Sequence, residues 1–579
     1  MIKRIRRPLG KLKRFIKRKF YERNIGKHYK AWLAQAEHAA AGSVTFPETI
    51  SIVIPVYNPP IQFLKECVDS VLNQTATNWQ LILSNDGSTS QEVKEYLRNI
   101  QEELDGQQDP RITILNNTNG GISAAINAGL ELCTGEYFGM LDHDDQLDPR
   151  CIEEFSKAIR ENAHPKAIYS DEDKINTNNV HSELYCKPDF SPELLLTQMY
   201  LCHFTIWNTE MVKHAGGLRT EMDGGQDFDL ALRLLPQLTS DAHEVAHIPL
   251  PLYHWRTWEH STARSIEAKP WAQEAAARAQ QDYLNTNFAG GVVTPSEVRG
   301  LNEIHPKTLK TRVSVIIPTA LTVNQKTKEP FAYQAIRTLQ AQESNTDFEV
   351  IVVTTNEQAP VPGADKQVTY ATEDFNFSEA INLGAQAADP QSEYLLFLND
   401  DTEAITPNPI MRMLEIAQIE NVAAVGAKLT YPEGKLQHIG ILMLPSGPTH
   451  PFIGKSKSEY GYFGSALTPR NYSAVTAAAM LTSKQAFEEV HGFDTDFARD
   501  FNDVDYCLKL RAANYRIAWT PYAQFTHHEG VSIHRKTPNP QEARLFNDRW
   551  HNQQEAFPET DPYYSPALNQ KLERIYEAH

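Results

Sequence analysis

The first half of the chain alternates short apolar runs with amphipathic stretches. Aliphatic and β-branched residues fill "SIVIPVYN" from Ser51, "WQLIL" from Trp79 and "RITIL" from Arg111, and such runs are typical of buried strands. The intervening "FLKECVDSVLNQ", from Phe63, gathers its apolar residues on one face of a helix. A further run, "EYFGML" from Glu136, ends at a cluster of acids. Strands that alternate with helices predict right-handed crossovers in a parallel α/β sheet.

The second half repeats this order of segments. "VSVIIPTA" matches the opening strand, "YQAIRTLQAQ" the first helix, "FEVIVVTTNE" the second strand, "FNFSEAINLGAQAA" a loop and helix, and "EYLLFLNDD" the acid-bearing strand. Further along, "GGQDFDLALRL" matches "DFNDVDYCLKL", which pairs Asp227 with Asp503, and "PLYHWR" matches "QFTHHE", which pairs His254 with His527. Matches in one fixed order indicate a tandem duplication, with a linker near Gly290–Lys307.

We therefore predict two tandem α/β domains, each built on a Rossmann-like, mostly parallel sheet. The first domain is expected to cover residues 46–295 and the second residues 308–566. A basic amphipathic segment, residues 1–45, precedes them, and a short tail, residues 567–579, follows. Ligands of such sheets gather outside the carboxyl ends of the strands, and the acid clusters are predicted to lie there.

Charge is distributed unevenly along the 579 residues. The net charge is -18, yet the first twenty residues, "MIKRIRRPLGKLKRFIKRKF", hold ten Lys or Arg and no acid. The rest is strongly acidic, which argues against a body that binds nucleic acid by neutralising phosphates. Six cysteines without CxxC spacing favour a reducing, cytoplasmic setting. No run approaches the roughly 18 apolar residues of a spanning helix, and a signal peptide is not indicated.

The basic N-terminus carries its own pattern. Ile5, Leu9, Leu12 and Ile16 recur at spacings of three and four, and Pro8 is tolerated in the first turn of a helix. An apolar stripe within a basic field predicts a helix on an anionic membrane surface. A solvated tail, or a helix packed on the first domain, is the alternative. We expect a cytoplasmic protein, peripheral on the inner face of the cytoplasmic membrane.

Both halves supply oxygen-rich clusters followed by a histidine. Such clusters suit Mg²⁺ or Mn²⁺, which bind few carboxylates and complete their shells with phosphate oxygens and water. A cation held this way neutralises a pyrophosphate leaving group. The residues concerned are Asp142, Asp144 and His254 in the first half, and Asp400, Asp401 and His527 in the second.

Asp227 and Asp503 are candidate general bases. The apolar pattern places each at the start of a helix, where the helix dipole favours the ionised carboxylate that accepts a proton from a hydroxyl. Each feature alone has an ordinary explanation, because Asp-x-Asp commonly fills turns, a lone histidine commonly packs, and Asp227 can be a helix N-cap. The shared order of the features favours a site.

These motifs resemble the inverting family 2 glycosyltransferases of GT-A fold. "SIVIPVYN", "SNDGS", "NGGISAAINAGL", "LDHDD", "YSDEDKI" and "QDFDLALRL" are similar to the first domain of tandem bacterial polysaccharide or O-antigen glycosyltransferases. "FNFSEAINLGA", "LNDDTE", "VGAKLTYPEGKLQHIGI", "DPYYSPAL" and the stretch from "FNDVDYCLKL" to "FTHHEG" are similar to the second. The resemblance covers about Ser51 to Pro566. It implies transfer of a sugar from a nucleotide-diphosphate donor to a saccharide or lipid-linked acceptor, with rhamnosyl transfer as one candidate.

The resemblance also implies a role for individual residues. Asp227 and Asp503 are the expected catalytic bases, and Asp144, His254, Asp401 and His527 are the expected metal ligands. The donor nucleotide is expected to contact Pro55, Tyr57, Asp86, Asn127 and Asp142 in the first domain, and Pro318, Asn382 and Asp400 in the second.

The second half departs from this pattern at the nucleotide. Where the first half has "LSNDGS", the second has "VVTTNEQAP" without an aspartate. A charge-assisted hydrogen bond to a base is typically worth ~1.5–3 kcal/mol, so its loss predicts weaker donor binding. Either both domains are active, one linkage each, or one catalytic domain accompanies a saccharide-binding or assembly domain. A sugar nucleotidyltransferase, the third alternative, needs a Gly-rich phosphate loop that "SIVIPVYNPP" does not supply.

Overall fold

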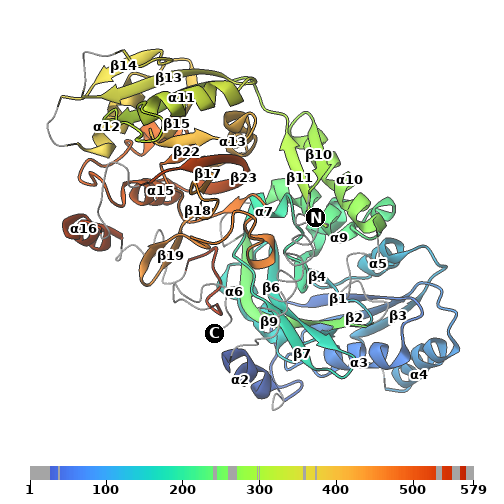
Figure 1. Ribbon diagram of the computed structural model, residues 1–579. Coiled ribbons are helices and arrows are strands. Elements are labelled where there is room, and N and C mark those ends of the chain that lie inside the picture. The colour runs from blue at the N-terminus through green and yellow to red at the C-terminus, as the bar shows by residue number, and fades with distance from the viewer. Residues whose placement is uncertain are drawn as a thin grey trace, which may run out of the picture.

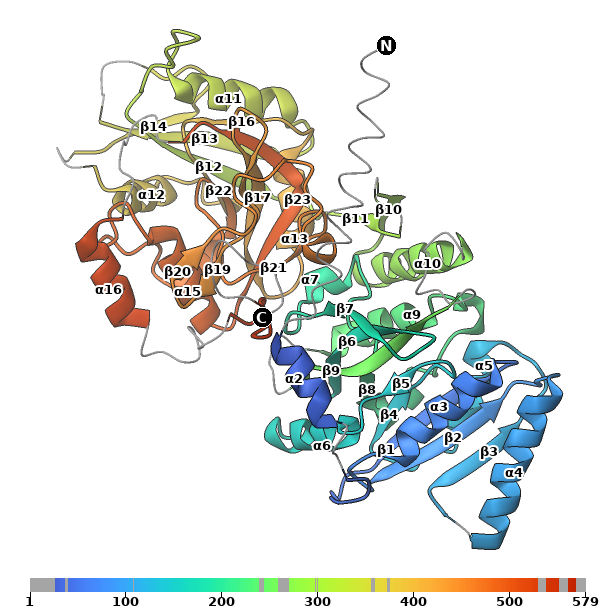
Figure 2. The same cartoon turned by 60° about the horizontal axis from the view of Figure 1, so that its bottom comes forward.

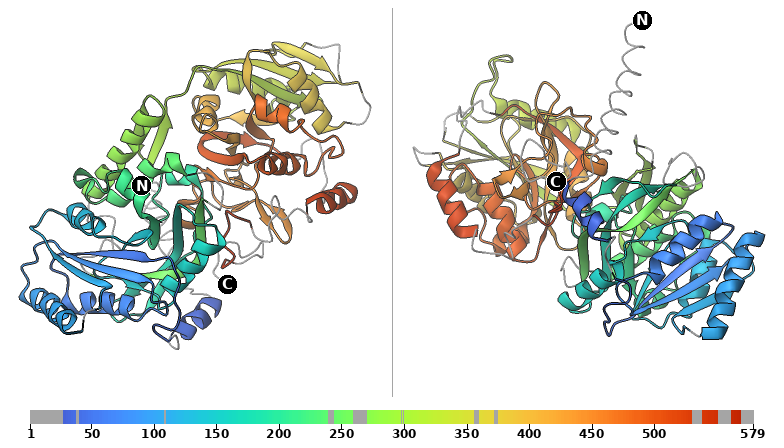
Figure 3. Two further views of the ribbon diagram at one scale, coloured as in Figure 1. Left: turned by 180° about the vertical axis from the view of Figure 1, so that it is seen from behind. Right: turned by 90° about the horizontal axis from the view of Figure 1, so that it is seen from below.

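The computed structural model shows two lobes that lie side by side (Figure 1). It describes residues 27–36, 40–107, 109–238, 244–258, 270–296, 298, 300–355, 360–371, 375–529, 538–550 and 561–568. The basic helix predicted within the first twenty residues therefore lies outside the described residues. Views from behind and from below show the same two lobes (Figure 3).

The first lobe contains a nine-stranded sheet of order β3-β2-β1-β4-β8-β6-β9-β5, with β7 paired to β6. Along this path β8 is antiparallel to both of its neighbours, β4 and β6, and β5 is antiparallel to β9. The other neighbouring strands of the path pair in parallel. Its strands are β1 (Ile50–Val56), β2 (Trp79–Asn85), β3 (Ile112–Asn116), β4 (Tyr137–Met140), β5 (Gln146–Leu147), β6 (Ala167–Asn176), β7 (His181–Tyr185), β8 (Thr205–Asn208) and β9 (Val245–Thr257).

The second lobe repeats this strand order and adds β21, which pairs with β23, and the small sheet of β19 and β20. Its main path is β14-β13-β12-β15-β22-β17-β23-β16, with β18 on β17 where the first lobe has β7 on β6. The prediction of two tandem α/β domains with mostly parallel sheets is confirmed. The strands are β12 (Arg312–Thr319), β13 (Asp347–Thr354), β14 (Lys366–Thr369), β15 (Ser392–Leu398), β16 (Thr402–Ala404), β17 (Val422–Thr430), β18 (Leu436–His438), β19 (Leu442–Leu444), β20 (Gly447–Thr449), β21 (Arg470–Asn471), β22 (Ala479–Ser483) and β23 (Arg516–His527).

Helices cover the sheets, as apolar faces of amphipathic segments require. In the first lobe they are α2 (Lys27–Ala36), α3 (Ile61–Leu72), α4 (Gln91–Gln107), α5 (Ile122–Leu130), α6 (Cys151–Glu161), α7 (Pro192–Leu195), α8 (Thr209–His214), α9 (Gln226–Leu234) and α10 (Pro270–Asn287). In the second they are α11 (Phe331–Gln342), α12 (Phe377–Gln386), α13 (Pro409–Ala417), α14 (Lys484–Glu489), α15 (Asn502–Ala512) and α16 (Pro540–Trp550). No helix among the described residues is both long and apolar enough to cross a membrane.

The duplication extends to the packing of single glycines. A Cβ on Gly129 of α5 would meet the Val53 side chain of β1 at 2.5 Å, and a Cβ on Gly384 of α12 would meet Ile316 of β12 too closely as well. Val53 and Ile316 hold the same place in the two opening strands, opposite Met140 and Phe397. Helix and strand therefore approach equally closely in both lobes.

The predicted linker forms a hairpin between the lobes. Strands β10 (Gly291–Pro295) and β11 (Asn302–Pro306) pair antiparallel, next to α10 (Figure 1). Elsewhere the lobes touch directly, since Glu193 of α7 pairs with Arg516 of β23 and Ser191 donates to Asn471 Oδ1 at 2.7 Å. Each domain therefore has its own sheet, and the hairpin and these contacts join the two domains.

Candidate active sites

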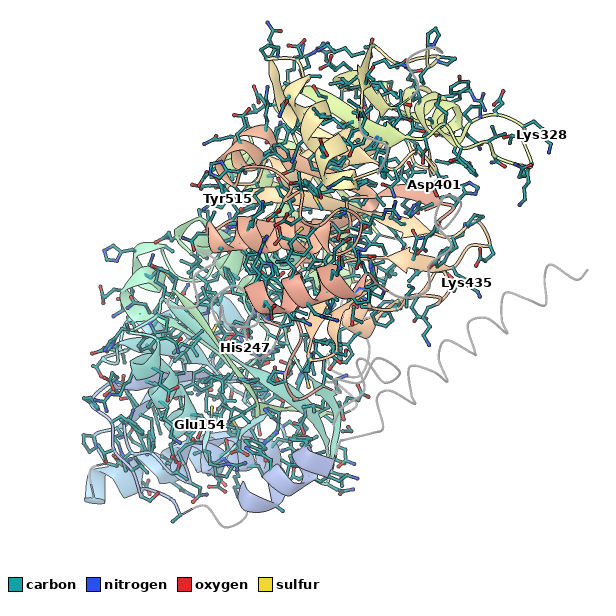
Figure 4. All side chains as sticks on the ribbon, turned by 90° about the vertical axis from the view of Figure 1, so that its left-hand side faces the viewer. Glu154, His247, Lys328, Asp401, Lys435 and Tyr515 are labelled. Atoms are coloured by element: carbon teal, nitrogen blue, oxygen red, sulfur yellow. The ribbon has the colours of Figure 1, made fainter. Side chains whose placement is uncertain are left out.

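Acidic residues follow the carboxyl ends of two equivalent strands, β4 in the first domain and β15 in the second. Asp142 and Asp144 follow β4, and Asn399, Asp400 and Asp401 follow β15. Met140 lies opposite Val53, and Phe397 lies opposite Ile316, so the pairing registers give Asp401 the place of Asp144 and Asn399 the place of Asp142. Figure 4 labels Asp401 in the second domain. The strand registers therefore agree with the sequence alignment of the two acid clusters.

Asp227 and Asp503 both lie in the first turn of a helix, α9 and α15 respectively. Burial raises the pKa of Asp227, the nearby His203 opposes this rise, and the charge of Asp142 adds to it. A carboxylate with a raised pKa is a stronger proton acceptor once it is ionised.

In the second domain one stretch of backbone joins the base to the acid cluster. Ala477 N–H donates to Asp503 Oδ2 at 3.2 Å, and the neighbouring Ala478 carbonyl accepts from Asn399 N–H at 3.0 Å. Asp503 also accepts from Val504 N–H at 2.9 Å. The candidate base and the acid cluster are therefore held beside each other.

His527 lies against Asp401 at the acid cluster of the second domain. Its Nε2 lies 3.0 Å from Asp401 Oδ1, while its Nδ1 lies 2.8 Å from Gln437 Oε1. An amide oxygen accepts only, so Nδ1 carries the proton and Nε2 is left as a ligand atom beside the carboxylate. Oxygen and imidazole ligands of this kind fit Mn²⁺. Sequence patterns did not identify Gln437, because it comes from β18, far from the other residues in the chain.

Asp400 points back toward its own opening strand. Its Oδ2 accepts from Thr319 Oγ1 at 2.5 Å. Burial raises the pKa of Asp400 to about 6, although the Thr319 hydroxyl opposes this rise. In the first domain the equivalent residue, His143, contacts the Pro55 carbonyl at 2.8 Å. The middle residue of each acid cluster therefore secures the loop to the sheet.

The sequence alignment that paired His254 with His527 is wrong by one residue. Gln146 of β5 lies opposite His254, whereas Thr402 of β16, equivalent to Asp145, lies opposite His527. Neighbouring residues of a strand point to opposite faces of the sheet, so a shift of one residue turns the side chain away. His254 accordingly contacts Asp173, at 2.6 Å, and not the acid cluster where it was expected.

Asp144 contacts a tryptophan in the described part of the first domain, whereas its equivalent Asp401 contacts a histidine. Trp258 Nε1 donates to Asp144 Oδ2 at 2.6 Å, and Arg256 Nε donates to its carbonyl at 2.7 Å. The adjoining Asp145 is fully occupied by Tyr253 and by the backbone of Arg256. Asp144 and Asp142 remain suitable oxygen ligands for Mg²⁺ or Mn²⁺, and residues 259–269 lie outside the described chain.

Asp86 organises the loop before α5. Its carboxylate accepts from Gly120 N–H at 2.8 Å, from Gly121 N–H at 3.0 Å and from Asn119 Nδ2 at 3.0 Å. In the second domain the register gives its place to Thr355, which is exposed. There Asn376 caps α12 instead, by accepting from Glu379 N–H at 3.1 Å. In the second domain an asparagine at the start of the helix therefore binds backbone N–H in place of this aspartate.

The two asparagines expected at the nucleotide are held by backbone. Asn127 Nδ2 donates to the Leu218 carbonyl and its Oδ1 accepts from Leu218 N–H, both at 2.8 Å. Asn382 makes the same pair with Phe493, at 2.7 and 2.9 Å. Both amides therefore bind the backbone at Leu218 and Phe493, which precede the two candidate bases in the chain. Of the other expected contacts, Tyr57 is exposed, and Pro55 and Pro318 lie within β1 and β12.

Comparisons with known proteins agree with this architecture. The model of "Glycosyl transferase family 2" matches residues 51–214 and again 314–490, once per domain. An uncharacterized protein of Sinorhizobium fredii is 34% identical over 90% of this chain and 57% of its own length. The O-antigen biosynthesis protein RfbC of Myxococcus xanthus is 31% identical over 93% of this chain and 42% of its own length. The chain thus spans about half the length of these relatives.

Shorter similarities concern single domains. The chondroitin synthase of Pasteurella multocida is 32% identical over 32% of this chain and 18% of its own length. Among solved structures, S. aureus TarS 1-349 in complex with UDP-GlcNAc aligns with a TM-score of 0.30 and 15% identity, over 42% of this chain and 73% of that one. With the family model matched in both halves, the chain belongs to glycosyl transferase family 2.

Proposed function

We propose that the protein is a metal-dependent, inverting glycosyltransferase that builds a bacterial surface polysaccharide. Each domain would use its own nucleotide-diphosphate sugar and form its own linkage on a growing, lipid-linked acceptor. One observation carries this proposal: in both domains a carboxylate lies in the first turn of a helix, and acids follow the equivalent strand of the sheet. The similarity to an O-antigen biosynthesis protein supports the polysaccharide product.

The proposed chemistry needs one proton acceptor per domain. Asp227, with its pKa raised by burial, takes the proton of the acceptor hydroxyl as that oxygen attacks the anomeric carbon, and Asp503 does the same in the second domain. Attack from the face opposite the leaving nucleoside diphosphate inverts the configuration. Asp142 lies close enough to Asp227 to affect its pKa, so the donor diphosphate and the acceptor would meet between the two.

Divalent metal would bind at the acid clusters. Asp144 would hold it in the first domain, and Asp401 with His527 in the second. When bound, Mg²⁺ or Mn²⁺ supplies positive charge that neutralises the departing diphosphate. His527 is prepared for this role by Gln437, which fixes the proton on Nδ1.

The alternative hypothesis is that the second domain is not catalytic. Thr355 cannot make the charge-assisted bond to a nucleotide base that Asp86 is proposed to make, which would favour a saccharide-binding or assembly domain. Asp401 and His527 nevertheless lie 3.0 Å apart, and Asp503 begins the helix equivalent to α9, which supports activity of the second domain. We therefore favour two active domains. Rhamnose is one candidate for a donor sugar, and the inner face of the cytoplasmic membrane is the proposed location.

The decisive experiment separates the two bases. Asp227→Asn and Asp503→Asn variants of the full chain are assayed with a panel of nucleotide sugars on lipid-linked acceptor extracted from the source cells. Each variant should stop the glycan at a different length, with turnover lowered at least about 1,000-fold at the affected linkage. Asp69→Asn, an exposed acid of α3, is the matched control.

Two results would redirect the proposal. If Asp503→Asn leaves the product unchanged, the second domain is a binding module. If neither variant alters sugar transfer while the wild type releases pyrophosphate from a nucleoside triphosphate, the protein is a nucleotidyltransferase instead.

A further inference from the structure

Four elements of the first domain bring ionisable side chains together away from Asp144. Asp173 of β6 accepts from His254 Nδ1 at 2.6 Å on one oxygen and from His181 Nδ1 at 2.7 Å on the other. The hydroxyl of Tyr29, from α2, also donates to Asp173. The rings of His181 and His254 lie edge to face, with centroids 4.7 Å apart.

The chemistry of this cluster matches a metal site. One ligand atom from each of Asp173, His181 and His254 can be chosen so that all three lie within 4.8 Å of one another. A carboxylate with two imidazoles suits zinc and neighbouring transition metals, which bind such atoms at about 2.0–2.2 Å. Asp173 and His254 are buried, whereas the side chain of His181 is 27% exposed and gives access from solvent.

The second domain serves as an internal control. By the pairing of β17 with β23, Thr430 and Thr526 occupy the positions of Asp173 and His254. The same sheet is therefore built with two neutral hydroxyl groups there. The sheet itself therefore does not require a carboxylate and an imidazole at these two positions, and their presence distinguishes the first domain.

The charges of the cluster favour one another. Burial favours the neutral acid, yet the imidazoles of His254 and His181 hold the pKa of Asp173 below its usual range. Burial likewise works against the charged imidazole, yet Asp173 raises the pKa of His254. The further charged groups nearby, Asp148 and Arg150, neutralise each other in an ion pair at 2.9 Å.

We propose that Asp173, His181 and His254 bind one divalent transition-metal ion of the zinc class, separate from the ion proposed at Asp144. Tyr29 closes the site, so the ion fastens α2 to the first domain. Trp32 supports this contact, because its ring lies under the Arg150 guanidinium at 3.7 Å (Figure 2 shows α2 beside α6). Metal binding releases the protons of the two imidazoles, so it weakens at low pH.

Cobalt is a suitable probe, because imidazole-bound Co²⁺ absorbs visible light. The full chain with Asp144→Asn and Asp401→Asn, which removes the two proposed catalytic ions, is stripped with chelator and titrated with Co²⁺. We expect one tight equivalent. His181→Gln in this background should weaken it by more than about 100-fold, since losing even an outer partner of a metal costs about 10- to 100-fold.

A second variant excludes misfolding as the cause. Asp173→Thr with His254→Thr installs the residues that the second domain tolerates at these positions, so this variant should fold yet bind no tight Co²⁺. Zn²⁺ should raise the melting temperature of the parent and leave this variant unchanged. Equal Co²⁺ affinity in the parent and in His181→Gln, or no tight binding by the parent, would overturn the proposal and leave a hydrogen-bonded cluster. Neither result depends on glycosyl transfer.

Discussion

His247 lies between two carboxylates near the junction of the two lobes (Figure 4). Its Nε2 contacts Asp171 at 2.9 Å and its Nδ1 contacts Asp189 at 2.8 Å. Although burial opposes the charged form, the two carboxylates raise the pKa of His247 to about 9. Asp189 in turn donates its N–H to the Pro562 carbonyl, at the C-terminal end of the described chain. One side chain thus supports the contact between the domains.

The charge of His247 predicts a loss of stability at high pH. An unfolded histidine titrates near 6.5, so the stabilisation is fully present below about pH 6.5 and is lost as pH rises through about 9. The free energy of unfolding of the wild type minus that of His247→Gln should therefore shrink between pH 6.5 and 9.5. Urea denaturation at several pH values measures it, and a difference that does not vary with pH would contradict the assignment.

At the scale of elements, two helices use the same side chain to hold a distant segment. Asn127 of α5 and Asn382 of α12 each make two hydrogen bonds to one backbone residue, and each lies against a glycine of positive φ, Gly217 and Gly492. A Cβ on either glycine would come within 2.6 Å of the asparagine oxygen. Helix, asparagine and glycine therefore form one unit that leads to the candidate base.

Removing this amide should destabilise either domain by a similar amount. Asn127→Ala leaves the N–H and carbonyl of Leu218 without their partner, at a cost of about 1–3 kcal/mol. Asn382→Ala should cost about the same, while Asn285→Ala, whose bond to Gln281 is exposed, should have little effect. Chemical denaturation gives these differences. A large effect in one domain and none in the other would show that the units are not equivalent.

At the scale of the molecule, a buried ion pair joins the domains. Glu193 is completely buried and accepts from Arg516 Nη2 at 2.9 Å and from Arg516 Nε at 3.1 Å. Tyr462 of the second domain adds a bond to Cys186 N–H at 2.9 Å, and Phe463 stacks on Tyr185 at 3.9 Å. These contacts hold the two domains against each other.

Breaking this pair should uncouple the domains. Glu193→Ala leaves a buried guanidinium without its carboxylate, which costs about 3–5 kcal/mol. We expect calorimetry to resolve two unfolding transitions in place of one. Glu274→Ala, on the exposed face of α10, should leave the trace unchanged. A single transition at the wild-type temperature in Glu193→Ala would mean that the interface does not depend on this pair.

Much of the fold and part of the candidate site follow from local patterns. The apolar runs predicted β1, β2, β12 and β13, and the acids at the strand ends were predicted because parallel strands share an edge. The position of Asp227 in the first turn of α9 was likewise predicted from spacing. What spacing missed is contact between distant strands: Gln437 behind His527, and Trp258 on Asp144.

The sequence by itself determined the duplication, the order of the elements and the residue types of the two acid clusters, because these depend on local periodicity and on repeated order. Only the tertiary structure decided which face of β9 carries His254. β6 pairs with β9 in the same net register as β17 pairs with β23, so His254 has the place of Thr526 and lies one residue before the place of His527. Because side chains alternate along a strand, that single step separates His254 from Asp144 and joins it to Asp173.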